Sequence, residues 1–133
     1  MSTEKNLAIV KHILEEFART GDTQPLFDGI ADDAVFVLAI PRDLPLARVH
    51  RGKDGLRAYF ERARELMELL ESRVHGYLAD DCRVVVLGDE RYRARSTGIV
   101  YATEWVLRFD FAGDKIVRMH SFEDLTGLVE AAP

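Results

Sequence analysis

The chain has 133 residues, of which 47% are hydrophobic, and a formal net charge of -5. This length suits one domain over residues 1–133 with a single hydrophobic core. The acidic balance argues against nucleic acid as a partner, because nucleic-acid affinity depends on a surplus of Lys and Arg. No apolar run is long enough to span a bilayer, and the N-terminus lacks the pattern of a secretory signal. We expect a cytoplasmic protein with no membrane partner, in which the single cysteine, Cys82, is buried.

The N-terminal part of the chain predicts two helical segments. Apolar residues recur at helical spacing over residues 7–17, with Ser2 or Thr3 available as N-cap and Gly21 placed to end the helix. Pro25 then opens a short second helical turn, since proline is tolerated in the first turn of a helix.

The middle of the chain predicts a buried strand, a loop and a long helix. Residues 35–40 form a short apolar run typical of a strand covered on both faces, and residues 41–51 indicate a loop. From Asp54 the helical period returns, with a polar opposite face and one apolar stripe: Leu56, Tyr59, Phe60, Ala63, Leu66, Met67 and Leu70.

The last part of the chain predicts consecutive antiparallel strands near residues 74–78, 82–87, 99–111 and 116–122. Alternation in the third places Trp105 on the inward face. Gly88 and Asp89 either end the second strand or mark a bulge in a strand running to Arg95, and we favour the bulge. Helices followed by antiparallel strands predict an α+β fold in which helices cover one face of a curved sheet.

Seven short motifs follow one another along the chain: Gly21-Asp22, Ala31-Asp32-Asp33-Ala34, Gly52-Lys53-Asp54-Gly55, Val84-Val85-Val86-Leu87-Gly88, Glu104-Trp105, Gly113-Asp114-Lys115-Ile116-Val117 and Phe122-Glu123-Asp124-Leu125. In this order and spacing they resemble the SnoaL-like and ketosteroid-isomerase-like branch of the nuclear-transport-factor-2-like superfamily. The resemblance covers nearly the whole chain. It implies a cone-shaped barrel of a curved antiparallel sheet wrapped around N-terminal helices, with an apolar pocket and usually a homodimer.

The catalytic positions that the resemblance implies are occupied by other residues here. The carboxylate base of ketosteroid isomerases falls at Leu38, their tyrosine at Leu14 and their protonated aspartate near Trp105. The aspartate of the cyclases and epoxide hydrolases falls at Ser121. Leucine has no titrating proton, so we do not expect a standard ketosteroid isomerase.

Two residues of the last strand are the candidate catalytic groups. Glu123 alternates with Met119 and Ser121, so it can face the pocket, where burial would raise its pKa and suit it to acid or base work. A carboxylate at the rim of the pocket is the alternative. His120 has the opposite parity, which favours the outer face of the sheet or a dimer interface over a catalytic role.

We expect a small hydrophobic molecule to bind against residues of five elements. The histidines lack paired metal-ligand spacing, so no metal and no other cofactor is expected. Tyr59 and Trp105 could equally serve core packing alone. The residues expected to contact the ligand are Phe17, Leu38, Tyr59, Trp105, Met119 and Ser121.

Two functions remain open. One is an isomerase, cyclase or hydrolase-like enzyme that works by proton transfer; the other is a binding or accessory protein without turnover. A buried Glu123 facing a ligand-sized void would favour the enzyme, and an entirely apolar cavity would favour binding. In either case we expect a homodimer through the open face of the sheet, where Val100 and Phe122 need cover.

Overall fold

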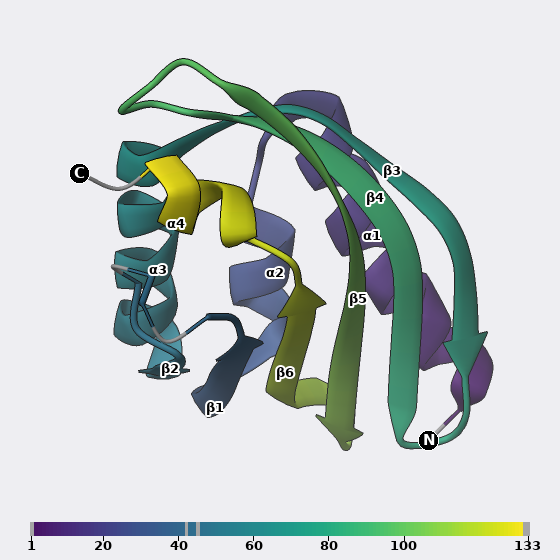
Figure 1. Cartoon of the computed structure of the whole chain (residues 1–133). Helices are drawn as coiled ribbons and strands as arrows, with labels where there is room; N and C mark the ends of the chain where they lie inside the picture. Colours follow the sequence, from purple (N-terminus) through teal and green to yellow (C-terminus); the bar gives the residue numbers. More distant parts are fainter. Residues whose placement is uncertain (1, 42, 45, 132–133) are drawn as a thin grey trace.

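A computed structural model describes residues 2–41, 43–44 and 46–131, which form helices and one curved sheet (Figure 1). The long elements predicted from the sequence are all present. In chain order the elements are α1 (Thr3–Thr20), α2 (Gln24–Gly29), β1 (Ile30–Ala39), β2 (Val49–Arg51), α3 (Gly52–Leu66), β3 (Met67–Ala79), β4 (Arg83–Ala94), β5 (Val100–Ala112), β6 (Lys115–Glu123) and α4 (Thr126–Ala131).

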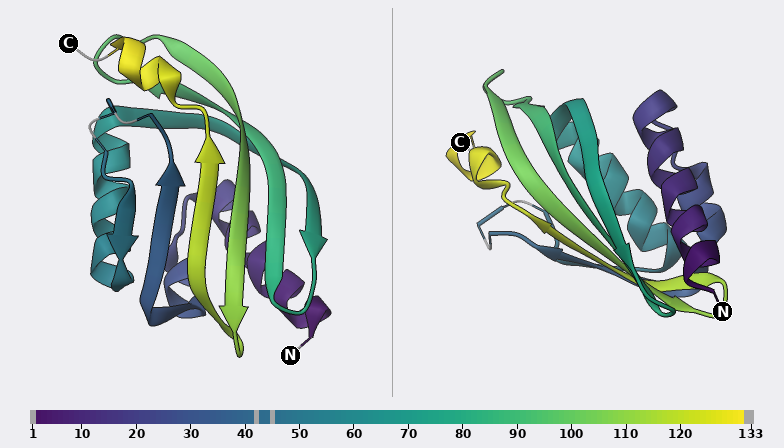
Figure 2. Two further views of the ribbon diagram at one scale, coloured as in Figure 1. Left: turned by 60° about the horizontal axis from the view of Figure 1, so that its bottom comes forward. Right: turned by 90° about the vertical axis from the view of Figure 1, so that its right-hand side faces the viewer.

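The sheet has six strands in the order β2-β1-β6-β5-β4-β3. Its neighbouring strands are antiparallel except for β1 and β6, which are parallel. The sheet curves strongly without closing, and α1, α2 and α3 lie on its concave side (Figure 2). This arrangement confirms the predicted α+β cone, in which the helices and the sheet enclose the core between them.

The ends of α1 follow the predicted capping chemistry. The Ser2 side chain accepts a hydrogen bond from the Lys5 backbone N–H at 2.9 Å. At the other end Gly21 has a φ of 76°, and its N–H donates to the Phe17 carbonyl at 2.8 Å. This left-handed conformation favours glycine, so Gly21 ends the helix and turns the chain towards α2.

The long helix α3 is shorter than the sequence predicted. It ends at Leu66, and Met67 is already extended, with φ -147° and ψ 154°. Pairing with β4 explains the difference, because Met67 lies opposite Ala94 in the ladder. The apolar stripe continues past the helix end, but its later residues belong to β3, where tertiary pairing overrides the helical period.

Strand β4 is continuous to Ala94, and the expected bulge at Gly88 and Asp89 is wrong. The pairing of β4 with β5 runs without a shift from Arg83 to Arg93. The irregularities lie instead in the partner strand β3, between Leu69 and Glu71 and between Val74 and Gly76. Since β3 is an edge strand, it absorbs the bending of the sheet at positions with a single neighbour.

Two short elements were not predicted from the sequence. Strand β2 lies within the segment expected to be a loop and pairs with β1, placing His50 opposite Phe36; residues 42 and 45 of that segment lie outside the described residues. Helix α4 follows β6. Leu125, just before the helix, and Leu128, within it, are both buried. Both elements are too short to show a period in the sequence.

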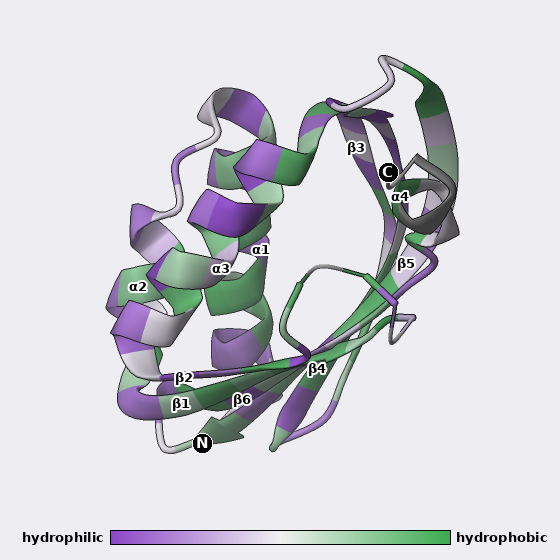
Figure 3. Cartoon of the chain, turned by 60° about the vertical axis from the view of Figure 1, so that its left-hand side comes forward, coloured by the Kyte–Doolittle hydropathy of each residue, from purple (hydrophilic) through white to green (hydrophobic). Residues whose placement is uncertain are grey.

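Hydrophobic residues concentrate along the strands and on the helix faces that meet them (Figure 3). Cys82 departs from its prediction: it is exposed, in the turn between β3 and β4. In the described residues, no helix combines the length and the apolar character needed to cross a membrane.

Candidate active site

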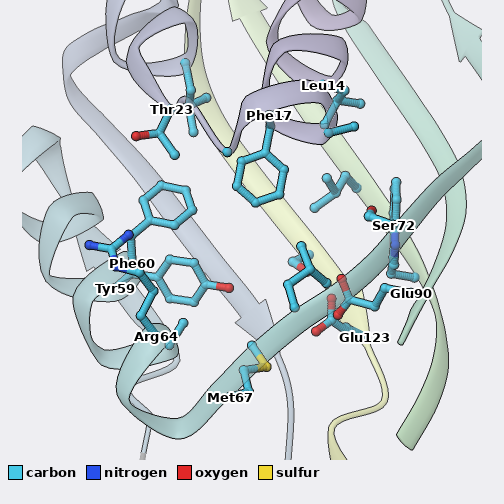
Figure 4. Close-up of a pocket in the computed structure, with 18 of the residues that line it drawn as sticks. Leu14, Phe17, Thr23, Tyr59, Phe60, Arg64, Met67, Ser72, Glu90 and Glu123 are labelled. Carbon is cyan, nitrogen blue, oxygen red and sulfur yellow. The ribbon is translucent and has the colours of Figure 1, made fainter. Parts of the chain in front are cut away.

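A cavity of about 570 Å³ lies between the helices and the concave face of the sheet (Figure 4). This volume is within the range typical of small-molecule sites. Its lining is mainly apolar and comes from α1, α2, α3 and strands β1 and β3–β6. The exposed residues of the lining, among them Asp22, Leu69 and Leu70, mark where the cavity meets solvent.

Aromatic rings form much of the wall. Phe17 of α1, Tyr59 and Phe60 of α3, and Trp105 of β5 all line the cavity. The Tyr59 ring packs edge-on against Phe36, with ring centroids 4.7 Å apart, and against Phe60 at 5.2 Å. These contacts fix the direction of the Tyr59 hydroxyl, because edge-to-face ring pairs have a preferred geometry.

Gly88 makes room for the Trp105 indole. The two residues lie opposite each other in the β4–β5 ladder, on the inward face. A Cβ at Gly88 would be 2.6 Å from Trp105 Cη2 and would also overlap Cζ2 and the Arg73 carbonyl oxygen. Only glycine leaves space for the ring over the strand, so Gly88 determines where one wall of the cavity stands.

Two carboxyl groups lie together on the sheet side of the cavity. Glu123 ends β6 and is opposite Trp105, while Glu90 of β4 lies two residues beyond Gly88, on the same face. Both side chains line the cavity, and they are hydrogen bonded to each other. Figure 4 shows the two carboxyl groups side by side, facing the space between α1 and α3.

This pairing changes the acidity of both groups. Burial, followed by the charge and hydrogen bond of Glu90, raises the pKa of Glu123 well above its ordinary value of 4.5. Burial also raises the pKa of Glu90. Two adjacent carboxyls in an apolar site cannot both ionise easily, so the pair holds a proton at a pH where an exposed glutamate is fully ionised.

The Tyr59 hydroxyl is a further polar group in the lining of the cavity. It points towards the side where Glu90 and Glu123 lie (Figure 4) and has no hydrogen-bond partner among the described residues. Burial, and then the charges of Glu123 and Glu90, raise the pKa of Tyr59. The phenol therefore keeps its proton and can donate it in a hydrogen bond to a polar atom of a ligand.

A family model described as a SnoaL-like domain matches residues 10–119, which is most of the chain. The chain belongs to the SnoaL-like domain family. No curated protein matches this SnoaL-like domain.

Solved structures agree with the assignment. A nuclear-transport-factor-2-like protein from Burkholderia xenovorans is 30% identical, with a TM-score of 0.82 over 100% of this chain and 99% of that one. A Mesorhizobium loti protein, provisionally named a SnoaL-like polyketide cyclase, is 20% identical, with a TM-score of 0.73 over 86% and 96%. A provisionally named isomerase from Rhodopseudomonas palustris is 15% identical, with a TM-score of 0.73 over 95% and 94%. The last two likenesses show the fold alone.

Most residues expected to contact a ligand line the cavity of this SnoaL-like domain. One does not: Leu38 is 2% exposed and packs in the core outside the lining, so its expected contact with a ligand is corrected. Strand β1 reaches the cavity through Phe36 instead. The predicted residues in the lining are Phe17, Tyr59, Trp105, Met119, Ser121 and Glu123.

His120 is placed on the outer face of the sheet. Its ring stacks on Phe122, with centroids 4.2 Å apart, and it pairs in register with Arg108 of β5. Burial, and then Arg108 and Arg118, lower the pKa of His120. His120 therefore lies on the face of the sheet opposite the cavity, as its parity predicted, and it does not line the cavity as a catalytic group would.

Glu90 was missed by the sequence analysis. A bulge at Gly88 and Asp89 would interrupt the alternation of side chains along the strand, so the sequence did not show on which face Glu90 lies. With β4 continuous, alternation from Val84 and Val86 puts Gly88 and Glu90 on the inward face.

Within the described part of the chain, no three His, Cys, Asp or Glu side chains gather in a way that could hold a metal ion.

The raised carboxyl pKa values predict a pH-dependent stability. A folded state with a raised carboxyl pKa binds protons more tightly than the unfolded chain does. Stability is therefore greatest below the unfolded pKa and falls as the pH rises through the folded pKa, by about 1.4 kcal/mol per unit of pKa difference at most. We expect Glu123→Gln to remove much of this loss, raising stability relative to wild type more at about pH 8 than at about pH 5.

Urea unfolding at the two pH values measures this effect. Glu61→Gln is the matched control, because Glu61 lies on the exposed face of α3. An equal change of midpoint with pH in wild type and Glu123→Gln would contradict the raised pKa of Glu123.

Proposed function

We propose that this SnoaL-like domain is a proton-transfer enzyme of the isomerase or cyclase kind that acts on a small, largely hydrophobic molecule. The observation that carries the proposal is the hydrogen-bonded Glu90–Glu123 pair facing an apolar cavity of about 570 Å³. A buried carboxyl with a raised pKa near operating pH is suited to both accepting and returning a proton. The cavity has aromatic walls to hold the rest of the substrate.

Glu123 is proposed as the group that moves the proton. In its ionised form the carboxylate accepts a proton from an acidified C–H of the substrate, and it returns the proton at another atom. Glu90 is proposed as a positioning residue, because its hydrogen bond orients the Glu123 carboxyl and its charge raises the pKa of that group. One proton shared between the Glu90 and Glu123 carboxyl groups leaves the pair with a single negative charge. The pair therefore begins each reaction cycle in one defined ionisation state.

Tyr59 is proposed to bind the polar atom next to the reacting carbon. Its hydroxyl faces the same space as the carboxyl pair and remains protonated. A donor held in place by ring packing stabilises charge that develops on a substrate oxygen without reorganising during the reaction. The names given to the Mesorhizobium loti and Rhodopseudomonas palustris proteins are compatible with this chemistry at the level of fold.

Exchange of ligand C–H hydrogens for deuterium tests the proposed function. Native mass spectrometry of gently purified protein identifies a carried ligand, which is then incubated in D₂O with and without protein. If none is carried, 2-tetralone serves as a neutral probe with enolisable C–H bonds. We expect the protein to accelerate replacement of a specific C–H by C–D. Binding without any acceleration would support the alternative, a binding protein without turnover.

We also propose a homodimer formed through the outer face of the sheet. Phe122 is 41% exposed and Val100 38% exposed, and Phe122 lies opposite Val106 in the β5–β6 ladder. Exposed apolar side chains gathered on one face of a sheet are typical of an interface. We expect sedimentation to show a dimer at micromolar concentration and Phe122→Asp to shift it towards monomer. A wild-type monomer under those conditions would contradict the proposal.

A further inference from the structure

The negative charge of the Glu90–Glu123 pair has no cationic partner from the described part of the protein. None of the ion pairs among the described residues includes Glu90 or Glu123. A carboxylate in an apolar site without a counter-charge is unfavourable, because it has lost its hydration. The pair therefore favours a ligand that brings positive charge.

The two arginines that line the cavity do not supply this charge. Arg95 donates from Nε to the Arg64 carbonyl oxygen at 2.6 Å. The side chain of Arg64 lies on the side of Tyr59 and Phe60, away from the two carboxyl groups (Figure 4). Both arginines are exposed, which places their charges towards solvent.

The aromatic walls point to an organic cation in place of a metal ion. Phe17, Tyr59, Phe60 and Trp105 come from three elements around one cavity that also contains the carboxyl pair. The negative faces of aromatic rings attract an alkylated ammonium group, most strongly where water is excluded. Tyr59 adds a further indication, because its hydroxyl lines the cavity and points towards the side where the carboxyl pair lies.

We infer that the ligand of this cavity is a hydrophobic amine whose protonated nitrogen lies between the Glu90–Glu123 pair and the aromatic rings. This inference rests on the proposed use of the cavity as a substrate site and adds the chemical class of the substrate. An ammonium N–H can donate to a carboxylate oxygen, while the rings contact the carbon atoms bonded to nitrogen. The rest of the cavity accommodates an apolar body.

Two probes of the same shape separate charge from hydrophobicity. Benzyltrimethylammonium carries a fixed positive charge, and neopentylbenzene has a carbon atom where the first has nitrogen. Trp105 is the only tryptophan in the chain and lines the cavity, so its emission reports binding of either probe. We expect wild type at about pH 8 to bind the ammonium at least about tenfold more tightly than its neutral isostere.

Variants locate the origin of this preference. Glu123→Gln and Glu90→Gln should each reduce the preference severalfold, and the double variant should abolish it. Glu71→Gln is the matched control, because Glu71 lines the cavity but lies within 4 Å of Arg73 and Arg91. It should retain the preference. Thermal unfolding of each variant confirms that it is folded.

The outcomes distinguish this inference from the proposed function. Equal or tighter binding of neopentylbenzene by wild type overturns the amine class while leaving a ligand cavity and proton transfer intact. A preference that survives in the double variant also overturns the inference, since the charge would then be recognised elsewhere. Failure of both probes to bind overturns it and counts against the cavity as a site, whereas absent C–H exchange with the ammonium preference retained contradicts only the proposed catalysis.

Discussion

Glu123→Gln will slow the C–H exchange of a bound substrate by about 10²- to 10⁴-fold, the usual contribution of a positioned acid or base. Glutamine preserves the size of the side chain and its ability to hydrogen bond Glu90. It cannot accept a proton from carbon at neutral pH. The measurement is the rate of deuterium incorporation at saturating substrate, with Trp105 emission used to show that binding is retained.

The effect of Glu123→Gln is compared with that of Glu90→Gln, which changes the neighbouring carboxyl. Glu90→Gln removes the charge that contributes to the raised pKa of Glu123, so the pH–rate profile should move to lower pH with a smaller loss of rate. A purely structural effect would lower the rate without moving the profile. Glu71→Gln, at the mouth of the cavity, should change neither quantity. Exchange by Glu123→Gln at the wild-type rate would show that another group moves the proton.

Gly88→Ala will destabilise the fold and displace the Trp105 ring. The added Cβ would overlap the indole and the Arg73 carbonyl oxygen, and neither a ring nor a backbone atom can move aside freely. Overpacking of this kind costs about 1–3 kcal/mol. Because Trp105 lies beside Glu123 in the β5–β6 ladder, the variant should also weaken ligand binding.

Urea unfolding measures the loss of stability, and Trp105 emission reports the change in its surroundings. Gly76→Ala is the matched control: Gly76 lies in the adjacent strand β3, and a Cβ there would have no atom within 4 Å. It should have a much smaller effect. If both alanine variants unfold at the same urea concentration, the close approach of Trp105 to Gly88 is contradicted.

The sequence by itself determined the kind of fold and one of the two carboxyl groups of the candidate site, Glu123. Capping residues such as Ser2 and Gly21 and the period of apolar residues are local signals, so α1, most of α3 and the later strands could be predicted. The inward direction of Trp105 and Glu123 followed from alternation, because side chains of a strand take turns between its two faces. Each of these properties depends on a few neighbouring residues.

Only the tertiary structure decided which groups meet. Pairing with β4 ends α3 at Leu66, and the regular β4–β5 ladder brings Glu90 inward beside Glu123, although 33 positions separate the two residues along the chain. Burial then raises the pKa of each carboxyl, and neither group would show this shift in an isolated strand. Strand register and burial depend on contacts between distant segments, and these contacts leave no periodic signal in one sequence.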